Sequence, residues 1–252
     1  MKRILLTTVS LGVLGLSAPA LAADLTPYIK APAVAAPMYD WSGFYVGVFG
    51  GGGFGNHNLN NALGPAGFAN FTLNYSSTGG IGGGEAGFNW QSGSAVFGVE
   101  ADGFWSGIKG NNHFGSTDAF GFASDDATSL RWGGTLRARG GIAVDRLLLF
   151  FTGGWAYGSL QHTNTDTAFG IDQFTNKRNG LTAGGGIAYA MTSNLIGKIE
   201  YRYYDFGDYT RAAVASTGVT PNGQLPYTIH NTYSVVTLGL DYKFGGPVIA
   251  KY

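Results

Sequence analysis

The chain has 252 residues, of which 43 are glycine and none is cysteine, and only 12% are charged. This composition excludes a disulfide framework and a thiolate metal site, and the charged fraction lies well below the about 25% that is typical of soluble domains. The formal net charge is zero and the sequence has no basic cluster, so it lacks the charge pattern of a nucleic-acid-binding protein. Beyond the N-terminus, no apolar run approaches the about 18 residues that a membrane helix needs.

Residues 1–22 are predicted to form a secretory signal peptide. Lys2 and Arg3 provide a positive start, a short apolar run follows, and small residues then form a cleavage site. We expect cleavage after Ala22, with Ala23 as the alternative. The sequence therefore predicts export from the cytoplasm.

Residues 23–40 contain three prolines among alanines, which favours an extended periplasmic linker; a periplasmic contact segment is the alternative. Residues 41–252 are expected to form an all-β domain, an eight-stranded antiparallel transmembrane β-barrel. Its eight stretches alternate apolar residues with small or polar ones, as strands do. They are Phe44–Phe54, Gly80–Trp90, Ala95–Ile108, Ser129–Val144, Leu147–Leu160, Gly180–Met191, Leu195–Phe206 and Thr232–Phe244.

The connections between these stretches alternate in length. The tight turns are Gln91–Ser94, Asp145–Arg146 and Thr192–Asn194, whereas the long polar connections are Gly55–Gly79, Lys109–Thr128, Gln161–Asn179 and Gly207–Asn231. Short periplasmic turns and long extracellular loops are typical of a bacterial outer-membrane barrel. Because eight is an even number, both chain ends are expected in the periplasm.

Charged residues share one face of these strands. A cation on the lipid face costs about 2–4 kcal/mol near the bilayer midplane, so this face is predicted to line the lumen. The interior of an eight-stranded barrel is just wide enough for side chains to fill it, which predicts a buried ion-pair network that plugs the lumen. Its expected members are Glu85, Glu100, Asp102, Arg131, Arg137, Arg139, Lys198, Glu200, Arg202, Asp241 and Lys243.

Aromatic residues gather near the strand ends on the opposite, apolar face. Rings in this position form the interfacial girdles of membrane barrels, whereas a soluble protein, the alternative, would bury them. The predicted girdle consists of Trp90, Trp105, Trp132, Tyr201, Tyr203, Tyr242 and Phe244.

Several stretches, taken in order, resemble a known family across essentially the whole mature chain. They are Trp41–Gly47, Gly82–Trp90, Phe97–Asp102, Leu136–Gly141, Tyr201–Tyr204 and Tyr242–Phe244. The sequence is similar to the small outer-membrane β-barrel proteins of alphaproteobacteria, the major surface antigens of Brucella and rhizobia. This resemblance implies a barrel like the membrane domain of outer membrane protein A, in the outer membrane of a Gram-negative bacterium.

The resemblance also implies a role in envelope integrity and surface exposure, often under a loose porin label. One departure is that the chain continues past Phe244 to Tyr252. Either residue could be the terminal aromatic that the barrel-assembly machinery reads. The expected partners are this machinery and outer-membrane lipid with lipopolysaccharide; the sequence leaves the oligomeric state open.

No pattern of catalytic, cofactor-binding or metal-ligating residues emerges. His57, His113, His162 and His230 are interpreted as solvated residues in loops or at their edges, and Asp125–Asp126 and Asp205 with Asp208 as solvated loop charge rather than a cation site bridging lipopolysaccharide. A non-enzymatic, structural outer-membrane protein is therefore expected. A narrow porin-like diffusion channel is the alternative, and a loop-mediated adhesin or barrel enzyme is a third hypothesis.

Overall fold

The structure, a computed structural model, describes residues 39–61, 72–114, 124–166, 170–211 and 227–245. The predicted signal peptide, nearly all of the predicted linker, the central parts of the long loops and Tyr252 lie outside these ranges, so the predictions for them stay predictions. The described residues contain no helix that is long and apolar enough to cross a membrane.

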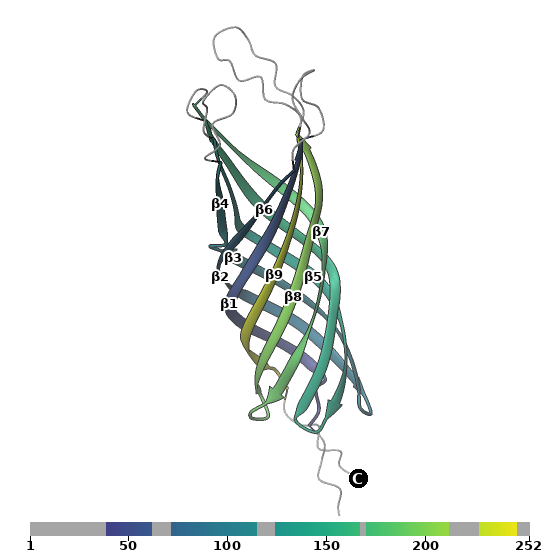
Figure 1. The fold of residues 1–252 in the computed structure, drawn as a ribbon. Helices are drawn as coiled ribbons and strands as arrows, with labels where there is room; N and C mark the ends of the chain where they lie inside the picture. The colour runs from purple at the N-terminus through teal and green to yellow at the C-terminus, as the bar shows by residue number, and fades with distance from the viewer. Residues whose placement is uncertain (1–38, 62–71, 115–123, 167–169, 212–226, 246–252) are drawn as a thin grey trace, which may run out of the picture. The chain divides into compact units, whose positions relative to one another are not determined.

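The strands are antiparallel and neighbour one another in a ring (Figure 1). They are β1 (Gly43–Asn61), β2 (Thr72–Ser92), β3 (Ala95–Ser106), β4 (Lys109–Phe114), β5 (Ser124–Val144), β6 (Leu147–Asp166), β7 (Gly170–Ala190), β8 (Leu195–Arg211) and β9 (Tyr227–Lys243). Strand β4 continues the path of β3, because both lie between β2 and β5.

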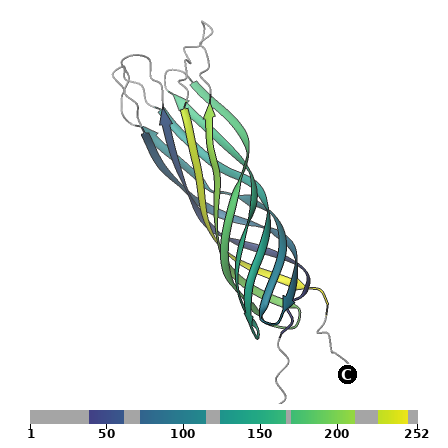
Figure 2. The same cartoon turned by 90° about the vertical axis from the view of Figure 1, so that its right-hand side faces the viewer.

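Pairing of β1 with β9 on one side and β2 on the other closes the sheet. The ring therefore has eight positions, and the predicted eight-stranded antiparallel barrel is confirmed. Figure 2 shows the strands tilted around a common axis, with the short β2–β3, β5–β6 and β7–β8 turns gathered at one end. The described residues before β1 and after β9 lie at this same turn end, where Trp41 Nε1 donates to the Asp145 carbonyl.

The strands extend further toward the long loops than the sequence predicted. Strand β1 continues from the expected Phe54 to Asn61, and β7 begins at Gly170 instead of Gly180. These extensions are polar but still pair residue by residue with their neighbours, so backbone hydrogen bonding continues where the apolar alternation stops. Since about 9–11 residues span a bilayer, strands of 17–21 residues project beyond it at the loop end.

The outer surface carries an exposed apolar belt. It covers the half of each long strand nearer the turns, for example Val46 and Val48 on β1 and Leu238 and Leu240 on β9. A soluble protein rarely exposes a continuous apolar surface of this extent. The belt therefore marks the segment that faces lipid, and beyond it toward the loops the outer face turns polar.

Candidate functional site

The lumen is filled by side chains in three layers. Along β3 the inward side chains run from Val96 through Glu100 and Asp102 to Phe104, and along β8 they run from Ile196 through Lys198 to Tyr204. Both strands thus pass from an apolar layer at the turn end, through a charged layer, to a second apolar layer. Because successive side chains of a strand point to opposite faces of the sheet, the three layers are built from every second residue of each strand.

Arg137 on β5 lies at the centre of the charged layer. Its guanidinium contacts the carboxylates of Glu100 on β3 and Glu200 on β8, and its Nη2 lies 3.2 Å from Asp102 Oδ2. The planar guanidinium has five donors in a fixed fork, so it can contact several carboxylates at once. One side chain thereby links strands on opposite sides of the ring.

Three other cations complete this layer. Arg139 Nη2 lies 2.7 Å from Glu100 Oε2, and its guanidinium stands 4.3 Å from the centroid of the Phe150 ring. Arg202 Nη2 lies 2.8 Å from Glu200 Oε2.

Lys198 Nζ contacts Glu85 and lies 3.6 Å from Asp241 Oδ2. Its aliphatic stem passes the inner side of Gly239, where an added Cβ would come within 2.8 Å of Lys198 Cε. Glycine at this position therefore makes room for the long side chain.

Solvent does not reach the charged layer. The side chains in its ion pairs have 0–3% of their surface exposed. Buried charges need partners, because an unpaired one loses its hydration without compensation. Five carboxylates and four cations form ion pairs with one another here.

Apolar clusters cover the charged layer on both sides. The turn-end plug consists of Trp41, Val96, Ala143, Leu148, Phe150, Ala188, Ala190 and Ile196. The loop-end plug consists of Phe49, Ile81, Phe104, Ile108, Leu130, Ala156, Leu160, Tyr204, Phe206, Tyr233 and Val235. Among the described residues, the charged layer therefore lies between two clusters of buried apolar side chains.

Arg131 does not belong to the charged layer, contrary to the prediction. The register between β5 and β6 shifts between Leu130 and Trp132, so the chain contains a β-bulge that reverses the alternation. Leu130 lies two residues before Trp132, so simple alternation would place both on the outer face, yet Leu130 is 0% exposed while Trp132 is 42% exposed. Arg131 is exposed and its Nη1 donates to Gln161 Oε1 over 2.7 Å.

Lys243 also lies outside the ion-pair network. Its side chain points inward, but at the turn end, where Nζ donates to the Asp40 carbonyl and lies 4.6 Å from the Tyr39 ring centroid. Among the described residues it has no carboxylate partner within ion-pair distance. The other predicted residues of the network all contribute to the charged layer.

The prediction that the histidines are solvated is wrong for two of them. His57 and His162 are not solvated loop residues but lie buried in β1 and β6, beyond the loop-end plug. His57 Nδ1 lies 2.6 Å from Asn231 Oδ1 and its Nε2 lies 3.0 Å from Ser77 Oγ. Burial lowers the pKa of His57, and the hydrogen bond to Asn231 offsets part of that effect.

The structure describes the side chains of only some of the other residues predicted to be solvated. His113 lies in β4, but its side chain is outside the described part of the structure. The same holds for the side chains of Asp125 and Asp126. His230 lies in β9, and its Nδ1 donates to Asp208 Oδ1 over 2.8 Å. Asp208 contacts this imidazole but keeps 70% of its side chain exposed, as expected for a solvated charge. The described residues contain no cluster suited to a metal ion.

The residues of the predicted aromatic girdle lie on the outer surface at the two edges of the belt. Their exposed fractions range from 38% for Tyr203 to 75% for Trp105. Trp90, Tyr242 and Phe244 belong to the edge near the turns, whereas Trp105, Trp132, Tyr201 and Tyr203 belong to the edge toward the loops. The sequence reasoning missed the inward aromatic residues of the loop-end plug, although their alternation with Trp105 and Tyr203 signals them.

Comparison with known proteins shows a family and several relatives. Residues 8–244 match the model of the outer membrane protein β-barrel domain. The 31 kDa outer-membrane immunogenic protein of Brucella melitensis is 32% identical over 89% of this chain and 93% of its own length. The 22 kDa outer membrane protein of Rhizobium leguminosarum is 31% identical over 68% and 66%, respectively.

Among solved structures, the outer membrane protease OmpT of Escherichia coli aligns with 83% of this chain and 99% of its own. The two share 12% identity, and the TM-score is 0.48. A likeness at this level carries no conclusion about activity.

Proposed function

This chain belongs to the outer membrane protein β-barrel domain family, and on that premise we propose that it is a structural, surface-exposed protein with a closed lumen. It lies in the outer membrane and resembles surface antigens. Its role is to contribute to envelope integrity as a rigid, lipid-embedded cylinder that does not conduct solutes. Its contacts are outer-membrane lipid, lipopolysaccharide and, during insertion, the barrel-assembly machinery.

The filled lumen is the observation that carries this proposal. A diffusion channel needs a continuous hydrated path, as the wide porin barrels have. Here the charged side chains are withdrawn from solvent between two apolar plugs. The same burial argues against catalysis in the lumen, because no substrate reaches the paired carboxylates.

Conductance of the refolded mature protein in a planar lipid bilayer tests the closed lumen. Intact barrels are first identified by their heat-dependent shift in gel migration. We expect no steady current from the folded protein. A double substitution in the loop-end plug, Phe104→Ala with Phe206→Ala, leaves the ion pairs in place and serves as a comparison. Reproducible unit steps from the wild-type protein would favour the channel instead.

Single cysteines test the proposed orientation, because the natural chain has none. Asn58→Cys places a thiol on the polar end of β1, and Ser193→Cys places one in the β7–β8 turn. In intact cells, a membrane-impermeant maleimide should label the first variant and spare the second. The reverse pattern would mean that the turns face outward.

A further inference from the structure

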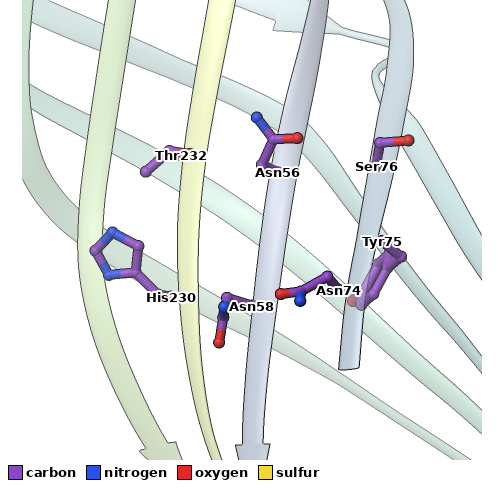
Figure 3. Close-up of a pocket in the computed structure, with 7 residues that line it drawn as sticks. All are labelled: Asn56, Asn58, Asn74, Tyr75, Ser76, His230 and Thr232. Atoms are coloured by element: carbon purple, nitrogen blue, oxygen red, sulfur yellow. The ribbon is translucent and has the colours of Figure 1, made fainter. Parts of the chain in front are cut away.

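We propose that a polar hollow on the outer surface of β9, β1 and β2 binds the hydroxyl groups of a neutral glycan. Its volume is about 470 Å³, and it is lined by Asn56, Asn58, Asn74, Tyr75, Ser76, His230 and Thr232. Figure 3 shows these residues distributed over three neighbouring strands, with the two β1 asparagines in the middle. The volume lies in the range of small-ligand sites, about 300–1,000 Å³.

Strand register arranges the outward side chains of the hollow in two rows. Asn56 pairs with Ser76 on one side and Thr232 on the other, and Asn58 pairs with Asn74 and His230 in the same way. Directly opposite side chains in a sheet lie about 4.5–5.5 Å apart at Cβ. The hollow thus presents closely spaced amide, hydroxyl and imidazole groups on one face.

The polar groups of the hollow divide into those with and those without a described hydrogen-bond partner. Asn58 accepts from Asn60, Tyr75 contacts Thr128, and His230 contacts Asp208. In the part of the chain that the structure describes, no hydrogen bond of the side chains of Asn56, Asn74 and Ser76 is found, and all three are exposed. A carboxamide both donates and accepts hydrogen bonds. Neighbouring amides can therefore match the adjacent hydroxyls of a sugar, each of which also donates and accepts.

The imidazole at the edge of the hollow is held in place. His230 Nδ1 donates to Asp208 Oδ1 over 2.8 Å, and its Nε2 lies 3.6 Å from Asp205 Oδ1. This double contact orients the ring, so that less conformational entropy is lost when a ligand binds.

The lining also indicates what the hollow does not bind. Among the described residues, its lining contains no lysine or arginine, the residues that recognise phosphate and carboxylate groups. The seven lining residues that the structure describes also include no tryptophan, arginine or large apolar anchor of the kind that dominates protein–protein interfaces. A neutral polyhydroxyl ligand remains the best chemical match.

The position of the hollow relative to the membrane surface indicates the source of such a ligand. Phe54, 50% exposed, is the last exposed apolar residue of β1 before the loop, and Asn56 and Asn58 follow it by two and four residues. Those steps correspond to roughly 7 and 13 Å along the strand, which reaches the polar headgroup region just outside the hydrocarbon core. Membrane glycolipid sugars lie at this level, and a soluble oligosaccharide has the same chemistry.

Purified protein in lipid nanodiscs provides the test. Asparagine side-chain amide signals are followed by NMR while maltopentaose, a water-soluble neutral oligosaccharide, is titrated into phosphatidylcholine nanodiscs. A second arm uses nanodiscs that contain digalactosyldiacylglycerol, a neutral glycolipid. The variant Asn56→Ala with Asn58→Ala should bind about tenfold more weakly, since it loses two hydrogen-bonding groups. Heat-dependent gel migration verifies that the variants are folded.

Asn179→Ala is the matched control, because Asn179 is exposed on β7, two residues beyond the exposed Leu181 of the belt. It should bind like the wild type. A response in both arms supports a site open to soluble glycans, and a response only with the neutral glycolipid supports a lateral glycolipid ligand. No response in either arm, or an unchanged response in the double variant, overturns the proposal. Because the protein is purified, such a failure would leave the closed lumen and the orientation untouched.

Discussion

The substitution Arg137→Ala removes the central cation of the charged layer. Arg137 contacts Glu100 and Glu200 and lies 3.2 Å from Asp102, with no exposed side-chain surface. Removing one partner of a buried ion pair costs about 3–5 kcal/mol, because the opposite charge stays buried.

The remaining contacts determine where in that range the cost falls. Glu100 keeps Arg139 at 2.7 Å, and Glu200 keeps Arg202 at 2.8 Å. No carboxylate is left without a cation, so we expect a loss of about 3 kcal/mol in the free energy of unfolding, at the lower end of that range.

Arg131→Ala is the matched control for this substitution. Both arginines lie on β5, and the alternation of the sequence places both on the inner face, yet Arg131 is exposed in the bulge with one hydrogen bond to Gln161. Its removal should change the free energy of unfolding by no more than about 0.5 kcal/mol. Urea unfolding in lipid vesicles, followed by tryptophan fluorescence, measures both values. Equal losses for the two variants would refute the three-layer description of the lumen.

Three further predictions concern other parts of the barrel. Because burial lowers the pKa of His57 below its usual 6.5, the unfolded state binds more protons between the two values. The free energy of unfolding should therefore rise with pH up to about 6.5 and then level off; His57→Gln should flatten this dependence, and an identical pH profile would contradict the buried position. Gly154→Ala should cost about 1–3 kcal/mol, since its Cβ would lie 2.1 Å from the Leu136 carbonyl oxygen, whereas Gly140→Ala meets nothing within 4 Å; similar unfolding midpoints would argue against this packing. Leu238→Arg, on the exposed belt of β9, should cost about 2–4 kcal/mol in lipid vesicles, and a neutral effect would show that this face does not contact lipid.

The amino-acid sequence determined the architecture because period-two alternation is a local property. The inward position of Glu100 and Lys198 and the outward position of Trp105 follow from counting every second residue within one strand. Alternation over eight stretches, with short and long connections in turn, was enough to predict the ring.

Tertiary structure decided the features that depend on pairing between strands. The bulge that turns Arg131 outward appears only in the register of β5 against β6, because an extra residue is unpaired relative to its neighbour. The polar strand extensions that bury His57 are held by backbone pairing, which carries no hydrophobic signal. Likewise, the contact of Arg137 with Glu200 joins residues 63 positions apart, and only closure of the barrel brings them together.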